Sequence, residues 1–537
     1  MSRGLYCSRE GIGMVKIILL AIVLRLFLLG SVPPSLNWDE VSQGYTAYSI
    51  AQTGRDEWEE KLPIFFRSYG EWKSAIYIYL LVPFIKILGL NVYSVRLPSA
   101  LAGIISVYLM YLLGKKLYSE KVGLWSAFLI SVTPWTFVLG RPGFEANVSL
   151  TLILAGMCFF LNSTTHHLRS IICSAILLGL APHTYNSAKI VVPLLVIYLV
   201  WTTKLYKNIK STLILFGILA IFAAPILLNL GSGHSLARFN QVGVATDLKS
   251  LNQFIVLRQF GTKFIFNKYT FSLYQTSANF LSYFNPSFLA VSGGDHTQHH
   301  LPYHGVLYLT ELILVLHGLT TLRKYPSTLK LLPLVIIALG FLPAAMTRDP
   351  YHVLRSLLAT PGFIFLAAIG ISHLQQIKYP HLKIVYWLLI IEVVSFMLAY
   401  FLWYPRAFAR DWQYGHQEVA SYLKAHESEY DHIVMTKWYG EPQLFLAFYN
   451  RWDPRVYQEH NQPLLRYEKE GRLWLDQLSE YSLGKYTFKY LDWANEIRDS
   501  RTLYVGKPDD FYPDSNIKKT ILFPDGTVAF HIVQGDK

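Results

Sequence analysis

Two adjacent carboxylates, Asp39 and Glu40, follow the first apolar stretch of the chain. That stretch, Met14 to Gly30, contains only two charged residues and is long enough to cross a bilayer. Pro33-Pro34 then ends any helix. Charges are costly to desolvate at a membrane, so acids in this place indicate a functional site. The alternative is that one of the two acids caps a surface helix starting near Val41.

Other polar residues able to do chemistry lie in, or at the ends of, loops predicted to face one side of the membrane. They are Lys73, Arg141, Glu145, His183, Tyr185, Asn186, His300, His304, His352 and Arg355. Tyr45 follows the carboxylate pair and is a further candidate for lining a substrate site. A carboxylate pair with Lys and Arg suits one kind of reaction. A base activates an acceptor hydroxyl while cations hold a phosphate leaving group.

Several of these residues also have a simpler structural interpretation. Lys73, at the start of a short apolar helix, could extend its ammonium group to the membrane surface. Arg141 and Glu145 are four residues apart and could form an ion pair at a helix end. The segment His183 to Asn186 could belong to an interfacial belt of aromatic residues.

Two further groups of residues leave alternatives open. His352 and Arg355, together with Arg348-Asp349, could bind phosphate or cap a helix starting at Ser356. A second group resembles a set of metal ligands but lacks a helical H-E-x-x-H frame, and histidines in loops are commonly only solvated. It comprises Asp295, His296, His299, His300 and His304. A divalent metal is therefore allowed but not required.

The composition indicates a polytopic membrane protein. Of 537 residues, 52% are hydrophobic and only 15% are charged, whereas soluble domains have roughly 25% charged residues. The net charge is +13, yet from Tyr404 onward 17 Lys and Arg face 20 Asp and Glu. The basic excess lies in the membrane part and is dispersed among short loops, which excludes a nucleic-acid-binding stripe. Three isolated cysteines form no disulfide framework.

Apolar runs and basic loops together predict about eleven transmembrane helices within residues 1–403. The N-terminus would face the cytoplasm because each predicted inner loop is basic. Residues 31–93 form the first outer loop, with an interfacial helix over Ala75–Leu90, and residues 229–303 form a long outer loop. We expect a multi-pass protein of a prokaryotic plasma membrane, in contact with its lipids, with the C-terminal domain outside.

Residues 404–537 are predicted to form a soluble extracytoplasmic α/β domain. The runs Asp431–Met435 and Arg501–Val505 indicate buried strands, and Gln417–His426 and Glu441–Tyr449 indicate amphipathic helices. A closing hairpin is expected around Pro524-Asp525-Gly526. Because the segment carries no recognised catalytic motif, we expect support, acceptor binding or partner docking from it.

Five segments of the chain form recognisable motifs. They are Trp38-Asp39-Glu40, Tyr69-Gly70-Glu71-Trp72-Lys73-Ser74, Arg96-Leu97-Pro98-Ser99-Ala100-Leu101, Gly140-Arg141-Pro142-Gly143-Phe144-Glu145 and His352-Val353-Leu354-Arg355. With these motifs the chain resembles bacterial members of the GT-C-fold glycosyltransferases that use polyprenyl-phosphate sugars. Within them it resembles the protein O-mannosyltransferases of glycosyltransferase family 39 and the lipid A aminoarabinose transferases.

The resemblance implies roles for individual residues. Asp39 would be the catalytic base, Glu40 would support it or bind acceptor, and Lys73 would hold the lipid phosphate. Arg141 and Glu145 would line the site. Ser74-Ala75 stands where relatives usually have Pro-Pro, a departure that concerns the specificity for the donor sugar.

The function predicted from the sequence is sugar transfer from a polyprenyl-phosphate donor to an outward-facing acceptor, with inversion and Asp39 as base. The sugar would be a hexose, mannose-like, or a pentose. Lys73, Arg141, His352 and Arg355 are the predicted phosphate ligands. The acceptor could be a protein, a lipid or a glycan. The alternative function is transport of a lipid-linked saccharide without chemistry, for which broken helices near mid-membrane would be expected.

Overall fold

The computed structural model describes residues 9–68, 72–162, 168–230, 241–325, 329–472 and 475–536. Tyr69–Glu71 of the family-like motif lie outside these described residues. The chain forms two compact units. One comprises Met1–Phe27 and Ser99–Leu398, and the other comprises Leu28–Pro98 and Ala399–Lys537. The division falls inside one long helix, α4 (Val92–Leu117).

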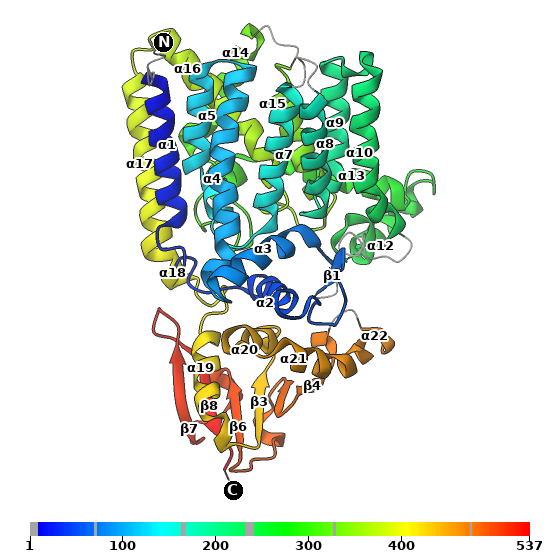
Figure 1. The fold of residues 1–537 in the computed structure, drawn as a ribbon, viewed down its shortest axis with the longest axis vertical. Coiled ribbons are helices and arrows are strands. Elements are labelled where there is room, and N and C mark those ends of the chain that lie inside the picture. Colours follow the sequence, from blue (N-terminus) through cyan, green and yellow to red (C-terminus); the bar gives the residue numbers. More distant parts are fainter. Residues whose placement is uncertain are drawn as a thin grey trace, which may run out of the picture. The chain divides into compact units, whose positions relative to one another are not determined.

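In the part that the structure describes, the first unit consists mainly of helices. Besides the main part of α4, these are α1 (Arg9–Leu26), α5 (Glu120–Val132), α6 (Pro134–Leu139), α7 (Glu145–Asn162), α8 (Leu168–Leu180), α9 (Ala188–Thr202), α10 (Ile209–Leu228), α12 (Leu248–Val256), α13 (Lys268–Ser282), α14 (Leu309–Thr321), α15 (Leu332–Ala345), α16 (Thr360–Gln376) and α17 (Leu382–Leu398). Helix α8 packs against both α7 and α10 (Figure 1). Helix α16 contacts α5, α14 and α15, which makes it the central helix of this unit. The predicted long outer loop, 229–303, contains α12 and α13 in its described part.

Several helices have the length and apolarity of membrane spans. Among the described residues five qualify on both counts, namely Val92–Leu117, Glu145–Asn162, Ile209–Leu228, Leu357–Gln376 and Leu382–Ala407. Shorter apolar helices cover Ala75–Leu88, Leu168–His183, Ala188–Thr202 and Leu332–Ala345. The predicted class, a helical polytopic membrane protein with a C-terminal α/β domain, is confirmed. The number of eleven crossings stays a prediction.

Two glycines let α14 and α16 approach closely. A Cβ at Gly318 would lie 2.0 Å from the carbonyl oxygen of Leu366, and a Cβ at Gly370 would lie 2.2 Å from that of Leu314. Backbone atoms cannot yield as a flexible side chain can, so neither position accepts a larger residue. Small residues at the contact are the common way to pack helices within a membrane.

The second unit combines a six-stranded sheet, a short β-ribbon and helices. The helices are α2 (Trp38–Thr53), α3 (Ala75–Leu88), α18 (Tyr404–Ala407), α19 (His416–His426), α20 (Pro442–Asn450), α21 (Pro454–Asn461) and α22 (Arg466–Lys469). The strands are β1 (Phe65–Arg67), β2 (Trp72–Ser74), β3 (His432–Thr436), β4 (Glu480–Leu483), β5 (Tyr486–Lys489), β6 (Thr502–Gly506), β7 (Ile517–Leu522) and β8 (Val528–Gln534).

The large sheet has the strand order β4-β5-β3-β6-β8-β7. Strand β3 runs parallel to β5 and β6, and the other pairs are antiparallel. All residues of β3 after His432 are buried, as expected of a central parallel strand. Observed strands and helices lie within one or two residues of those predicted near Ile433, Leu503, Val419 and Phe445, and β7 and β8 form the expected hairpin.

The compact units divide the chain differently from the predicted boundary at Tyr404. Helix α2 packs against α3, α20 and α21, so the first outer loop and the tail share one core. Two polar side chains of α21 hold the loop that follows α2. Gln458 Nε2 donates to the carbonyl of Asp56 at 2.7 Å, and Asn461 Nδ2 donates to the carbonyl of Glu57 at 2.9 Å.

Candidate active site

Asn37 caps α2, the helix whose first turn carries both predicted catalytic carboxylates. Its side-chain Oδ1 accepts a hydrogen bond from the Glu40 N–H at 2.9 Å, and Glu40 Oε2 accepts one from the Asn37 N–H at 3.1 Å. This reciprocal capping box satisfies N–H groups that a helix start leaves unpaired. The alternative that Asp39 or Glu40 caps a helix starting near Val41 is therefore wrong, because the helix begins at Trp38.

Glu40 forms a fully buried ion pair with Arg96, and both side chains are 0% exposed. Arg96 Nε and Nη2 lie 2.9 and 3.2 Å from the two carboxylate oxygens. Nη1 of the same arginine donates to the carbonyls of Leu29 and Pro33 at 3.0 and 2.9 Å. A buried, bidentate pair of this kind leaves a costly unpaired charge when either partner is removed. Glu40 thus has a structural role, and its predicted part in catalysis rests on the resemblance.

Asp39 differs from Glu40 because its carboxylate is accessible. The Asp39 side chain is 38% exposed, and its Oδ1 lies 2.8 Å from Nζ of Lys73, whose side chain is 9% exposed. Lys73 sits in β2 opposite Phe66 of β1, so the β-ribbon fixes its backbone beside the start of α2. A general base has to be reachable by the acceptor hydroxyl, which Asp39 is and Glu40 is not.

Tyr45 lies two turns further along α2 and is fully buried. Its hydroxyl donates to the carbonyl of Trp452 at 3.1 Å, and its ring meets that of Tyr457 edge-on at 4.9 Å. These contacts place Tyr45 in the packing of α2 against the tail rather than on an open surface.

Arg141, a predicted phosphate ligand in the first unit, is 0% exposed and covers the C-terminal end of α1. Nη1 donates to the carbonyls of Leu24 and Arg25 at 2.6 and 3.2 Å, and Nη2 donates to that of Phe27 at 2.7 Å. The last carbonyls of a helix lack intrahelical partners, and an arginine satisfies them well. Glu145 begins α7 and is partly exposed.

Three loops of the first unit meet at a group of histidines. The ring of His352 lies 4.9 Å from that of His296 and 5.1 Å from that of His299. The ring of His299 also meets Phe144 edge-on at 5.4 Å, which brings the loop before Glu145 to the same place. The structure therefore brings His352 together with two of the candidate metal ligands, His296 and His299.

Arg355 pairs with Asp349 at the edge of this group. Its Nη1 lies 3.1 Å from Asp349 Oδ2 and donates to Thr347 Oγ1 at 3.0 Å. Its backbone N–H donates to His352 Nδ1 at 3.3 Å. Since Asp349 is 51% exposed, this ion pair is open to solvent. A short 3-10 turn, Leu357–Ala359, follows, and the side chain of Ser356 does not cap it. The two roles expected of this group, phosphate binding and helix capping, both stay predictions.

The remaining predicted lining residues of the first unit occupy separate surroundings. His183 is 8% exposed, and its Nε2 lies 2.7 Å from the carbonyl of Phe222 in α10. Tyr185 is also 8% exposed. Asn186 Oδ1 accepts a hydrogen bond at 2.7 Å from the lysine three residues later. His304 is partly exposed.

Within the described part of the chain, no group of three or more His, Cys, Asp or Glu side chains is arranged to hold a metal ion. Asp295 is exposed, whereas His300 is buried with Nδ1 3.0 Å from the carbonyl of His296. Burial lowers the pKa of His300. Asp295, His299 and His300 thus differ in exposure, and metal binding by them stays a prediction.

Three charged residues that the structure places in important positions had no role in the sequence prediction. Arg96 stands in a family-like motif, yet its partner Glu40 is 56 residues away. Glu57 and Glu441 are buried acids of the second unit. Glu57 follows Asp56 in a polar loop, a pattern typical of a solvated surface, so no local signal identifies it.

Comparison with known proteins supports the fold. Residues 73–228 match a family model described as dolichyl-phosphate-mannose-protein mannosyltransferase, which is less than half of the chain. A search of curated proteins finds no match. ArnT from Cupriavidus metallidurans, solved with undecaprenyl phosphate, is 11% identical with a TM-score of 0.58, over 99% of this chain and 100% of that one. Its apo state gives 10% identity and a TM-score of 0.55, over 98% and 99%.

A third structure, the archaeal oligosaccharyltransferase AglB from Archaeoglobus fulgidus in complex with an inhibitory peptide and a dolichol-phosphate, is 13% identical with a TM-score of 0.46. The match covers 82% of this chain, which spans 63% of the length of that protein. Such a score is too low to argue from. The ArnT structures are similar to this chain over their whole length. Because their sequences are only 10–11% identical to it, this likeness establishes the fold alone. The chain therefore has the GT-C fold that the sequence motifs predicted.

Proposed function

We propose that the protein is an integral membrane glycosyltransferase that moves a sugar from a polyprenyl-phosphate donor to the hydroxyl of an acceptor, with inversion. The observation that carries this proposal is the pair formed by Asp39 and Lys73. An accessible carboxylate at the start of a packed helix lies 2.8 Å from a nearly buried ammonium group. The mannosyltransferase family model and the GT-C fold support the same class of reaction.

The proposed reaction is a single displacement at the anomeric carbon. The acceptor oxygen forms the new bond to this carbon while Asp39 takes the hydroxyl proton. The bond between the anomeric carbon and the phosphate oxygen breaks, and the electron pair leaves with the lipid phosphate. Lys73 would stabilise the negative charge that develops there, as a fixed cation does in a site of low dielectric. Attack from the face opposite the leaving group inverts the configuration, as in inverting glycosidases.

Lys73 would also link donor binding to the activity of the base. In the structure its ammonium group is paired with Asp39. The phosphodiester of the donor carries one negative charge, as the carboxylate does, and competes for the same cation. Arrival of the donor would therefore weaken the hold of Lys73 on Asp39 and leave this carboxylate better able to accept a proton.

The other predicted site residues stay predictions about donor and acceptor contacts. Arg355 and His352 are the remaining phosphate candidates that lie at a partly open group of side chains. Glu40, Arg141 and Tyr45 have packing partners that account for their positions. The cytoplasmic membrane of a prokaryote and the outward orientation of the C-terminal segment belong to the proposal.

The test is sugar transfer from a panel of radiolabelled polyprenyl-phosphate sugars in membranes that contain the protein. We expect Asp39→Asn to lower transfer by about 10²- to 10⁴-fold, the range for loss of a general base, while donor binding persists. Lys73→Ala, in contrast, should weaken both sugar transfer and donor binding. Glu59→Gln, which changes an exposed acid of the same loop, serves as the control.

Transfer by Asp39→Asn at the wild-type rate would contradict the assignment of the base. If the wild-type protein binds donor without consuming it, but moves the lipid-linked sugar across a vesicle membrane, the transport alternative replaces the enzyme.

A further inference from the structure

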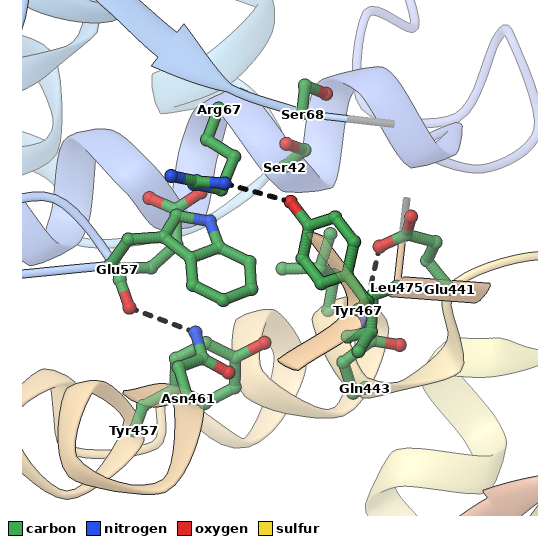
Figure 2. Close-up of a pocket in the computed structure, with 12 residues that line it drawn as sticks. Ser42, Glu57, Arg67, Ser68, Glu441, Gln443, Tyr457, Asn461, Tyr467 and Leu475 are labelled. Carbon is green, nitrogen blue, oxygen red and sulfur yellow. Dashed lines mark hydrogen bonds between the residues drawn. The ribbon is translucent and has the colours of Figure 1, made fainter. Parts of the chain in front are cut away.

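A small polar pocket lies inside the second unit, where the loop after α2 meets the tail (Figure 2). Water-sized groups can occupy about 30 Å³ of it. A single water needs about 10–15 Å³ by this measure, so the space suits two waters or one hydroxymethyl group. Its lining consists of Ser42, Glu57, Trp58, Arg67, Ser68, Glu441, Gln443, Leu444, Tyr457, Asn461, Tyr467 and Leu475.

The pocket lies along the same side of α2 as the proposed base. Asp39, Ser42 and Thr46 are spaced by three and four residues, which places them on one face of the helix. Ser42 lines the pocket. Thr46 Oγ1 donates to Glu57 Oε1 at 2.8 Å and so holds that carboxyl in the pocket wall.

Two buried carboxyl groups give the pocket its chemistry. Glu57 is 4% exposed and Glu441 is 7% exposed. Burial raises the pKa of Glu57 to about 8, with a further rise from Asp56. Burial also raises the pKa of Glu441 well above its ordinary value, with Asp476 adding to the rise. The nearby charge of Lys73 opposes both shifts. Near neutral pH Glu57 keeps a proton, and a protonated carboxyl can both donate and accept hydrogen bonds.

Among the described lining residues one is an arginine, Arg67, and acidic side chains already balance its charge. Arg67 pairs with Glu468 and lies 4.0 Å from Glu60. Its Nη1 donates to the Tyr467 hydroxyl at 3.1 Å, as the dashed line in Figure 2 shows. Its guanidinium group lies over the ring of Trp58 at 5.6 Å. A pocket with neutral acids and a matched arginine favours a neutral ligand over an anion.

Four buried polar atoms of the lining have no hydrogen-bond partner among the described residues. They are Glu57 Oε2, Arg67 Nε, Ser68 Oγ and Asn461 Oδ1. Glu57 and Asn461 are themselves more than nine-tenths buried. Nearly all buried polar groups in proteins are paired, so these atoms call for a partner that offers donors and acceptors together.

We propose that this pocket is an acceptor subsite, which takes one hydroxyl or hydroxymethyl group of a neutral carbohydrate. A sugar hydroxyl donates and accepts at once, as the four atoms require, and a hydroxymethyl group fills the available volume. The aromatic rings of Trp58 and Tyr467, which meet at 62°, offer apolar surface for the carbon atoms beside it. The proposal rests on the proposed function, because it makes α2 carry both the base and a contact to the molecule that the base activates.

The test measures binding rather than transfer, so its outcome is independent of the proposed chemistry. Saturation-transfer NMR is recorded with a methyl hexopyranoside and the purified full-length protein in detergent. We expect binding by the wild type and a loss of about tenfold in affinity for Glu57→Leu, as removal of one to two hydrogen bonds would cause. Asp39→Asn, which should not transfer sugar, should keep this binding. Glu59→Gln is the matched control, since it changes an exposed acid two residues along.

A methyl 6-deoxyhexopyranoside, which lacks the hydroxymethyl oxygen, should bind more weakly and without dependence on Glu57. Thermal unfolding verifies that the variants are folded, and Ser68→Ala, which removes another unpaired hydroxyl of the lining, replaces Glu57→Leu if the latter does not fold. Equal affinity of wild type and the folded lining variant, or no binding by a folded wild type, would overturn the proposal and leave the pocket as a site for water only.

Discussion

Glu57 is a carboxyl group whose proton the folded state keeps. Burial raises its pKa from 4.5 to about 8. Over this interval the folded state holds a proton that the unfolded state has lost, so the contribution of Glu57 to stability is present below its ordinary pKa and lost as the pH rises to about 8. We expect the free energy of unfolding to fall with rising pH, by at most about 1.4 kcal/mol per pH unit from this group.

Glu57→Gln should remove most of that pH dependence, because glutamine keeps the shape of the side chain without a titrating proton. The measurement is thermal unfolding in detergent at a series of pH values from mildly acidic to mildly alkaline. Asp56, whose pKa burial raises to about 6, should leave a residual slope at the acidic end. Glu59→Gln should keep the wild-type dependence of the unfolding temperature on pH. If the unfolding temperatures of wild type and Glu57→Gln change with pH in parallel, the Glu57 carboxyl is not the source of the pH dependence.

Asp39 and Glu57 show what the sequence reveals of individual site residues. Asp39 was found because it follows an apolar stretch directly, a local and visible pattern. Glu57 was not found, since its burial is produced by side chains such as Asn461, about four hundred positions later in the chain. Glu40 is visible in the sequence as the neighbour of Asp39, but only the structure reveals Arg96 as its buried partner.

At the scale of helices, the close contact between α14 and α16 depends on glycine. Gly318→Val should destabilise the protein by about 1–3 kcal/mol or more, since its side chain would collide with the Leu366 carbonyl. Gly370→Val should behave alike. The measurement is the yield of monodisperse protein in detergent together with its thermal unfolding temperature.

Gly217→Ala in α10 is the matched control, because a Cβ there would meet nothing within 4 Å. It should be neutral or slightly stabilising, since alanine has the higher helix propensity. If Gly318→Val unfolds at the same temperature as Gly217→Ala, the close crossing of the two helices is contradicted.

Elements with a strong local pattern were predictable. The buried strands near Ile433 and Leu503 and the hairpin around Gly526 appear where alternation and turn residues indicate them. The alternative of a helix starting near Val41 is wrong, because only the observed hydrogen bonds select Asn37, rather than Asp39 or Glu40, as the cap. The short ribbon of β1 and β2 was not predicted, since three-residue strands have too little pattern to detect.

At the scale of the whole molecule, composition predicted the membrane class but not how the chain divides. Charge changes sharply near Tyr404, and this change suggested a boundary there. The observed core of the second unit also includes α2 and α3. Polar contacts from Gln458 and Asn461 to the loop after α2 create that association. Such long-range polar pairing leaves no periodic signal in a single sequence.

The basic inner loops predict an orientation that can be tested on the intact molecule. Asp525 lies in the exposed turn between β7 and β8, and Lys207 lies in an exposed basic loop between α9 and α10. In intact cells, a membrane-impermeant maleimide should label Asp525→Cys, whereas Lys207→Cys should react only after permeabilisation. The wild-type protein gives the background from Cys158, which is buried, and from the other native cysteines. The reverse pattern would place the tail in the cytoplasm. The tail and the first loop share one core, so Asp39 would then face the cytoplasm as well. The proposed acceptor would therefore have to be cytoplasmic.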